Sequence, residues 1–337
     1  MFSLFLLTVS LATVGSSTAP AQKKAKDDRS GYDRSARATL LHPAIVYVTP
    51  SDDAEHIAEV APGHEVVVIE RNGSWVRVFA NTDTADKQSE DDQPEFNTDP
   101  TVTPASGWIR DKGIVTQTTA GGDAILYGSA ANLEDEAAQP HAPKGAAEQA
   151  HLLYRRVAEY FPDSPLAAES LFRAADVRWQ LDKADISTLP SAHEQEAYLR
   201  PQIYEGDMQR VLKLYPATKF AALAAYDLID NKLCGDWQGL PKCPEMEAVL
   251  YEKYADRYSD SPKAAEALYH ALYREAALVE LYKAQEEQKR SQQAAANAQS
   301  LAIELKQRFP QSDYAARAAS IAYRVQQGIA VYGSDRE

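Results

Sequence analysis

Residues 153–175, LYRRVAEYFPDSPLAAESLFRAA, predict a helix, a tight turn and a second helix. In the first half, Leu153, Val157 and Phe161 recur at the spacing that places apolar side chains on one helix face. Pro162 ends this helix, because its ring clashes with the preceding turn. The segment is therefore typical of a helical hairpin.

The second helix of this hairpin has its own start signal. We expect the Ser164 hydroxyl to accept a free backbone N–H and so to cap the helix. Pro165 suits the first helical position, where its missing N–H leaves no hydrogen bond unmade. Four residues then form the next apolar face: Ala168, Leu171, Ala175 and Trp179.

The same turn returns three times downstream. Each copy has an aromatic residue, a helix-breaking or polar residue, a hydroxyl residue and then two alanines at one register. The copies of the turn are Tyr215-Pro216-Ala-Thr218, Tyr258-Ser259-Asp-Ser261 and Phe309-Pro310-Gln-Ser312. One such helix pair cannot bury its own apolar face, so we expect the copies to stack on each other.

These repeats resemble tetratricopeptide repeats. In that family, the second helix of each repeat carries an alanine, an aromatic residue and a terminal proline, and here the helix that ends at Pro162 has this pattern. Ala150, Tyr154, Val157 and Pro162 occupy those positions, with valine where alanine is usual. The turn is also similar to that of the outer-membrane-assembly lipoproteins and cell-division coordinators. The resemblance implies an all-α solenoid over residues 123–332 that binds an envelope protein or peptide partner.

The repeats depart from the regular tetratricopeptide pattern in their spacing. The turns at residues 162, 216, 259 and 310 are farther apart than the about 34 residues of the regular repeat. We therefore expect long helices and inserted loops: a loop over 182–190, a helix over 194–215 with Pro201 either in its first turns or kinking it, and a cysteine-containing loop over 233–244. Residues 266–309 predict two helices that meet near Ser291, because the apolar heptads of a projecting coiled coil are absent.

The N-terminus resembles a secretory signal peptide. An apolar run from Phe2 to Val14 precedes small residues and the sequence Ala19-Pro20-Ala21, although the usual basic start is missing. We expect residues 1–21 to be this signal and the chain to be exported, periplasmic or extracellular; a buried N-terminal helix is the alternative. Residues 22–37 are charged and predict a flexible linker.

Composition limits the partners. The formal net charge of -14 disfavours nucleic acid and anionic membrane surfaces, which both require a basic face. No apolar run is long enough to span a bilayer, so we expect no transmembrane segment in the mature chain. Cys234 and Cys243 are the two cysteines, and in an oxidising compartment they predict a disulfide that closes a short loop, with two free thiols as the alternative.

Residues 38–116 change from helical to alternating periodicity. Three strands are predicted at Ala44–Val48, Glu65–Ile69 and Trp75–Phe79, with turns at Pro62-Gly63 and Asn72-Gly73. We expect a small all-β barrel. Residues 81–106 are rich in Asp, Glu, Thr and Pro, and they predict a mobile acidic loop inserted between two strands.

This region resembles the bacterial SH3 family in Gly63, in Gly73-Ser74-Trp75 and in Gly107-Trp108-Ile109. It departs from the family at Tyr47, where arginine is usual, and in the acidic insertion. The resemblance implies binding of cell-wall peptides or proline-containing segments, with peptidoglycan as a candidate ligand. Tyr47, Trp75 and Trp108 are the candidate groove residues, and burial in the barrel core is the alternative for each.

No stretch predicts catalytic residues, a metal site or a cofactor. Nucleophile-elbow, phosphate-loop, zincin and EF-hand motifs are absent. His56 and His64 flank a turn and predict surface histidines instead of a metal pair. We therefore expect a multidomain, non-catalytic exported scaffold. The alternatives are a cell-wall-active enzyme similar to helical lytic transglycosylases, and an adaptor whose barrel only caps the solenoid.

Overall fold

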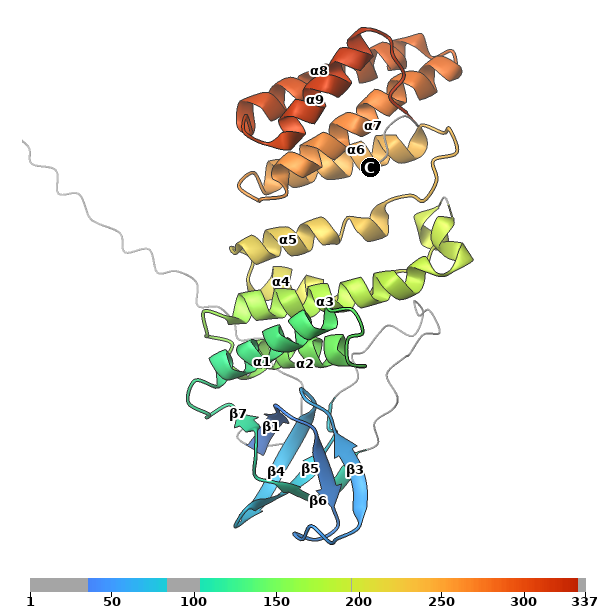
Figure 1. Cartoon of the computed structure of the whole chain (residues 1–337). Coiled ribbons are helices and arrows are strands. Elements are labelled where there is room, and N and C mark those ends of the chain that lie inside the picture. The colour runs from blue at the N-terminus through green and yellow to red at the C-terminus, as the bar shows by residue number, and fades with distance from the viewer. Residues whose placement is uncertain (1–35, 84–103, 195, 333–337) are drawn as a thin grey trace, which may run out of the picture. The chain divides into compact units, whose positions relative to one another are not determined.

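The computed structural model describes residues 36–83, 104–194 and 196–332. Within these ranges, one antiparallel sheet of seven strands precedes nine α-helices (Figure 1). The expected order of an all-β region followed by an all-α region is therefore confirmed. The predicted signal peptide, nearly all of the predicted linker and most of the acidic insertion lie outside the described residues.

The sheet has the strand order β3-β2-β6-β5-β4-β1-β7. Its strands are β1 (Arg37–Leu40), β2 (Ala44–Tyr47), β3 (His56–Val60), β4 (Glu65–Asn72), β5 (Trp75–Ala80), β6 (Ala105–Arg110) and β7 (Ile114–Thr116). Two strands extend slightly beyond the expected boundaries of the β region and its insertion. Arg37, at the end of the expected linker, belongs to β1 and pairs with Val67 of β4, and Ala105, near the end of the expected insertion, belongs to β6 and pairs with Ala80 of β5.

The core of the sheet lies on one face, and side chains alternate across it. On β5, Val76 and Val78 are fully buried, and Ile109 of β6 pairs with Val76 and is also fully buried. These residues pack with Val46 and Val66 into one apolar cluster. The alternation of β-branched residues with polar ones is what places them together.

The nine helices follow in sequence order. They are α1 (Gly122–Ala137), α2 (Ala146–Tyr160), α3 (Ala167–Ser187), α4 (Gly206–Leu214), α5 (Lys219–Asp227), α6 (Lys242–Arg257), α7 (Ala264–Ala284), α8 (Gln288–Arg308) and α9 (Asp313–Gln326). Helices α1 to α5 each pack on the next, as do α6 to α9, and α3 also contacts α1 and α5 while α7 contacts α9. We call α1, α3, α5, α7 and α9 the odd-helix layer.

The four predicted turns share one backbone geometry. Each preceding helix ends at a half-buried aromatic residue that leaves the helical conformation: Phe161, Tyr215, Tyr258 and Phe309, with φ of -127°, -130°, -120° and -131°. A hydroxyl three residues later accepts a backbone N–H, from Leu166 to Ser164 at 3.1 Å and from Ala221 to Thr218 at 3.3 Å. The sequence repeat is therefore a structural repeat.

One detail of the helix starts was wrong. Where proline follows the hydroxyl residue, the helix begins three residues after that residue, at Ala167 in α3, instead of at the proline. The N–H of Ala167 first bonds the carbonyl of Ser164 in a tight turn, and the helical bond from Ser170 to Leu166 comes after it. Without a following proline, α5 begins directly after Thr218.

Small residues allow the helices to pack closely. The third residue after each hydroxyl is a buried alanine, and the sixth is a fully buried alanine or serine. These residues are Ala167, Ala221, Ala264 and Ala315 at the third position, and Ser170, Ala224, Ala267 and Ala318 at the sixth. Only short side chains fit where the backbones of two helices pack closely together.

Three expected segments differ from the structure. Helix α3 continues to Ser187, through most of the loop expected over 182–190. The helix expected over 194–215 is present only as α4, from Gly206, because Pro201 cannot sit within a helix and short 3-10 turns precede it. The two helices expected near Ser291 meet at residues 285–287.

The sheet and the helices meet at α2. Gly63 has φ of 84°, and a Cβ built on it would lie 2.5 Å from Cβ of Leu152, so only glycine fits there. The buried Arg156 donates through Nε to the Gly63 carbonyl at 3.0 Å and pairs with Asp83 and Glu159. Burial raises the pKa of Asp83, but the His64 hydrogen bond and the Arg156 charge lower it below its ordinary value.

Candidate functional site

The odd-helix layer carries one repeated contact. The eighth residue after one hydroxyl touches the second residue after the next hydroxyl. The rings of Phe172 and Phe220 lie 5.9 Å apart, the Lys263 amine lies 5.1 Å from the Tyr226 ring, and the rings of Tyr269 and Tyr314 lie 5.4 Å apart. We call these six residues the ladder. Because all six are half-buried, the ladder both joins the repeats and presents aromatic surface.

Tyrosine–glutamate hydrogen bonds accompany the ladder. The fifth residue after the hydroxyl is Glu169 in α3 and Glu266 in α7. Glu169 accepts the hydroxyl of Tyr127 at 2.7 Å, and Glu266 accepts the hydroxyl of Tyr226 at 3.0 Å. In both cases the tyrosine belongs to the preceding odd helix. The same type of hydrogen bond therefore links α1 to α3 and α5 to α7.

Glu266 lies at the centre of a polar network. The nearby His270, whose Nε2 lies 3.9 Å from Glu266 Oε1, is the main cause that holds the pKa of Glu266 at about 2, with help from Lys263, although burial opposes the shift. The Lys263 amine donates to Glu266 at 2.7 Å. The carboxylate therefore stays ionised over the whole physiological pH range.

The network continues along α7 at four-residue spacing, which places Glu266, His270 and Arg274 on one face. Arg274 donates through Nη1 to the His270 carbonyl at 3.3 Å and through Nε to Glu247 of α6 at 2.8 Å. Glu247 and Arg274 are 1% and 6% exposed. Such a buried pair is stable only with further hydrogen bonds, and these come from the loop before α6.

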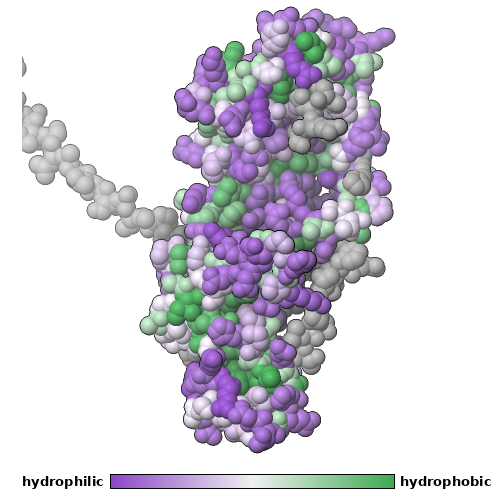
Figure 2. All heavy atoms as spheres, in the orientation of Figure 1, coloured by the Kyte–Doolittle hydropathy of each residue, from purple (hydrophilic) through white to green (hydrophobic). Residues whose placement is uncertain are grey.

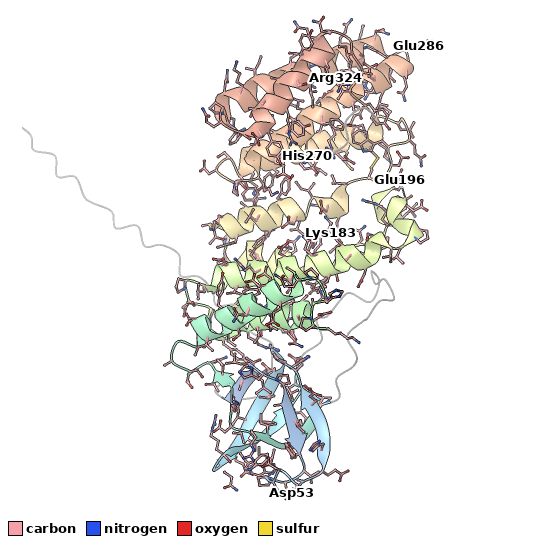
Figure 3. All side chains as sticks on the ribbon, in the orientation of Figure 1. Asp53, Lys183, Glu196, His270, Glu286 and Arg324 are labelled. Carbon is pink, nitrogen blue, oxygen red and sulfur yellow. A yellow bond between two sulfur atoms is a disulfide. The ribbon has the colours of Figure 1, made fainter. Side chains whose placement is uncertain are left out.

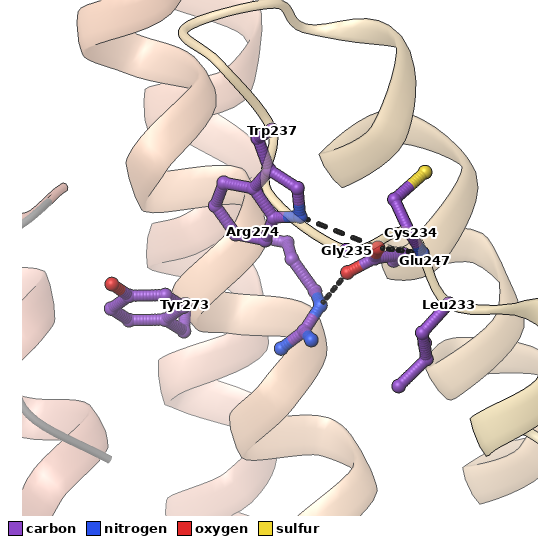
Figure 4. Close-up of a pocket in the computed structure, with 7 residues that line it drawn as sticks. All are labelled: Leu233, Cys234, Gly235, Trp237, Glu247, Tyr273 and Arg274. Atoms are coloured by element: carbon purple, nitrogen blue, oxygen red, sulfur yellow. Dashed lines mark hydrogen bonds and ion pairs between the residues drawn. The ribbon is translucent and has the colours of Figure 1, made fainter. Parts of the chain in front are cut away.

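A pocket of about 380 Å³ lies at this end of the network (Figure 4). Its lining residues come from the cysteine-containing loop and from α6 and α7: Leu233, Cys234, Gly235, Trp237, Glu247, Tyr273 and Arg274. Trp237 Nε1 and the Cys234 N–H both donate to Glu247 Oε1, at 3.3 and 2.9 Å. The pocket thus combines aromatic walls with a buried ion pair.

Carboxylates gather farther along the layer. Asp227 of α5 lies near Asp176 of α3 and Asp230, and burial together with these two charges raises the pKa of Asp227 to about 7. Lys183 of α3, labelled in Figure 3, forms an ion pair with Asp230 at 2.8 Å. The middle of the layer is therefore acidic, in keeping with the net charge of -14.

The three predicted barrel residues lie together on the sheet face opposite the apolar core. Tyr47 pairs with Trp108 across β2 and β6, and the rings of Tyr47 and Trp75 meet edge to face at 5.3 Å. Arg110 stacks over Trp75 at 4.1 Å and donates through Nε to Asp52 at 3.2 Å. This stacking leaves Trp75 only 8% exposed, whereas Tyr47 and Trp108 are half-buried.

The cysteines and histidines take structural positions. Cys234 and Cys243 form a disulfide, with Cα atoms 6.0 Å apart. His64 bonds Asp83 at 2.9 Å, and His56 packs against Tyr47 at 4.7 Å. In residues 36–83, 104–194 and 196–332, no group of three or more His, Cys, Asp or Glu side chains could hold a metal ion. The helices of the described chain include none long and apolar enough to cross a membrane.

Sequence reasoning did not identify the ladder, the α7 network or the pocket. The ladder had a visible signal, because aligning the four hydroxyl residues places Phe172, Tyr226 and Tyr269 at one position. The pairing of Glu247 with Arg274 had none, since it joins different helices 27 residues apart.

Comparisons with known proteins add little. No family model matches the chain, and no curated protein does. Among solved structures, a chain described as "DHF79 filament" is similar, with 17% sequence identity, over 61% of this chain and 96% of that one. Its TM-score is 0.18, so this similarity carries no argument about fold or function.

Proposed function

We propose that this protein is a non-catalytic scaffold of the cell envelope that binds an extended segment of a protein partner on its odd-helix layer. The ladder carries the proposal, because four helices present half-buried side chains at one repeated register. Partly exposed aromatic rings offer large contact area at low entropic cost. Hydrophilic residues cover most of the face seen in Figure 2, and hydrophobic residues form smaller groups among them.

We assign the helices to the tetratricopeptide type and the sheet to the bacterial SH3 type. The recurring aromatic helix ends and buried alanines support the first assignment. Gly63, Trp75 and the Gly107-Trp108 pair support the second, since a Cβ on Gly107 would lie 2.6 Å from the Tyr47 carbonyl oxygen. On this assignment the barrel surface of Tyr47 and Trp108 contacts peptidoglycan or a peptide.

Affinity capture with the full exported chain tests the proposal. Wild type is compared with Tyr269→Ala/Tyr314→Ala, which removes the last ladder contact, as bait for envelope extract. The matched control is Val249→Ala/Ile303→Ala, which truncates exposed side chains on α6 and α8. The scaffold proposal expects a partner that wild type and control retain and the ladder variant loses, with all three equally helical by circular dichroism.

Two outcomes would overturn the proposal. Equal capture by the ladder variant would remove the odd-helix layer as the binding surface. Clearing of purified peptidoglycan in a zymogram would show an enzyme in place of a scaffold.

Wall contact has a separate test. The full chain is sedimented with purified peptidoglycan, alongside Trp108→Ala and the control Ile69→Ala, whose side chain is 52% exposed on β4. Loss of sedimentation with Trp108→Ala alone supports the barrel surface. Failure of wild type to sediment would favour an adaptor whose barrel makes no wall contact.

A further inference from the structure

The disulfide closes the loop that carries Trp237. Cys234 and Cys243 are nine residues apart, and the bond ties the segment after α5 to the first turn of α6. Cys243 is 1% exposed, whereas Cys234 is half-buried. Of the two bonded cysteines, Cys234 is therefore partly exposed to solvent and Cys243 is not.

The loop and α7 share a single acidic partner. One oxygen of Glu247 accepts the Cys234 N–H and the Trp237 indole N–H, and the other accepts Arg274 Nε (Figure 4). Two of the three hydrogen-bond donors to Glu247 therefore belong to the loop, and the buried carboxylate keeps them only while the loop stays in this position. Leaving such a carboxylate without donors costs free energy, so the loop and the ion pair support each other.

The Trp237 ring is held from several sides. It stacks on Tyr332 with centroids 5.6 Å apart and planes 12° apart, and Tyr273 lies 6.2 Å away. Arg274 lies 5.6 Å from the ring. Beside Tyr332, Val331 is 1% exposed and belongs to the same apolar cluster as α6 and α7. The loop therefore joins three parts of the fold: α6, α7 and the segment after α9.

We propose that the Cys234–Cys243 disulfide is a redox-sensitive latch that holds Trp237 in place as a wall of the pocket. A dithiol reductant attacks the sulfur of Cys234, the half-buried member of the pair, the S–S bond breaks, and Cys243 leaves as a thiolate that takes a proton. The second thiol of the reductant then displaces Cys234 and forms its own disulfide, so two electrons pass to the protein. The reduced loop releases Trp237 and Glu247, while the helices keep their alanine-packed core.

The test uses the full oxidised chain and dithiothreitol. The fluorescence of Trp237 is obtained as the difference between wild type and Trp237→Phe, in both redox states. The latch predicts that reduction shifts this difference spectrum to the red and raises its quenching by acrylamide. Amide exchange over residues 233–241 becomes about 10- to 100-fold faster, as the entropy of a loop of this size implies. Far-ultraviolet circular dichroism stays unchanged.

A matched variant separates the latch from other effects of the reductant. Cys234→Ser/Cys243→Ser shows the reduced signature without dithiothreitol and does not respond to it. The reduced wild type keeps the test valid should this variant fail to fold. An unchanged Trp237 signal on reduction would overturn the latch. A general loss of helix signal would overturn it too, because the disulfide would then hold the whole fold instead of one loop.

Discussion

Asp227 shows how the packing of the odd-helix layer changes the chemistry of a single residue. Its pKa is raised from 3.8 to about 7 by burial and by the nearby Asp176 and Asp230. Between these values the unfolded chain has lost the proton while the folded chain keeps it, so ionisation opposes folding. The contribution of Asp227 to stability therefore falls as pH rises from about 4 to about 7 and stays low above that.

Asp227→Asn should remove this pH dependence. We expect the variant to be more stable than wild type by on the order of 1–3 kcal/mol at pH 8, with the difference vanishing near pH 4. Urea unfolding followed by circular dichroism across this pH range measures it. Asp260→Asn, at an exposed turn position, is the control and should change little. Parallel pH profiles for wild type and Asp227→Asn would contradict the assigned cause.

At the scale of helices and strands, local signals predicted more than distant ones. The turns after Phe161, Tyr215, Tyr258 and Phe309 were predicted because an aromatic end, a hydroxyl and two alanines act within a few residues. The start of α4 was missed, since helix-forming composition over 194–215 competes with Pro201. The gathering of Tyr47, Trp75 and Trp108 on one sheet face depends on strand pairing, so the choice between groove and core was open in the sequence.

The tyrosine–glutamate bonds between odd helices can be tested one at a time. Tyr226→Phe removes the hydroxyl that Glu266 accepts at 3.0 Å, and should lower the free energy of unfolding by about 1–2 kcal/mol. Tyr323→Phe is the matched control, because that side chain is 60% exposed on α9. Denaturant titration of both variants measures the difference. Equal stability would show that this bond does not hold α5 against α7.

At the scale of the whole molecule, the described sheet and helices are joined through Arg156. Its side chain is buried between Gly63, Asp83 and Glu159, and these partners come from both regions. Removing the guanidinium would leave the Gly63 carbonyl without its side-chain donor and Asp83 without its arginine, whereas Glu159 would still pair with Arg155 at 3.0 Å. The sequence contained no sign of this contact, because Arg156 and Gly63 are 93 residues apart and arginine is common on helix surfaces.

Arg156→Ala should therefore uncouple the two regions. We expect it to cost about 3–5 kcal/mol and to split one unfolding transition into two. Tryptophan fluorescence, which includes Trp75 and Trp108 of the sheet, and circular dichroism, which follows the helices, would report different midpoints. Arg71→Ala, which removes an exposed pair with Asp111, should keep the midpoints together. Coincident midpoints for Arg156→Ala would rule out this coupling.

Hydrogen–deuterium exchange of the full chain, with and without the partner recovered by affinity capture, tests the scaffold most directly. The account predicts slower exchange on binding in α3, α5, α7 and α9, around the ladder, with α6 and α8 unchanged. Protection confined to the sheet or to α6 and α8 would contradict it.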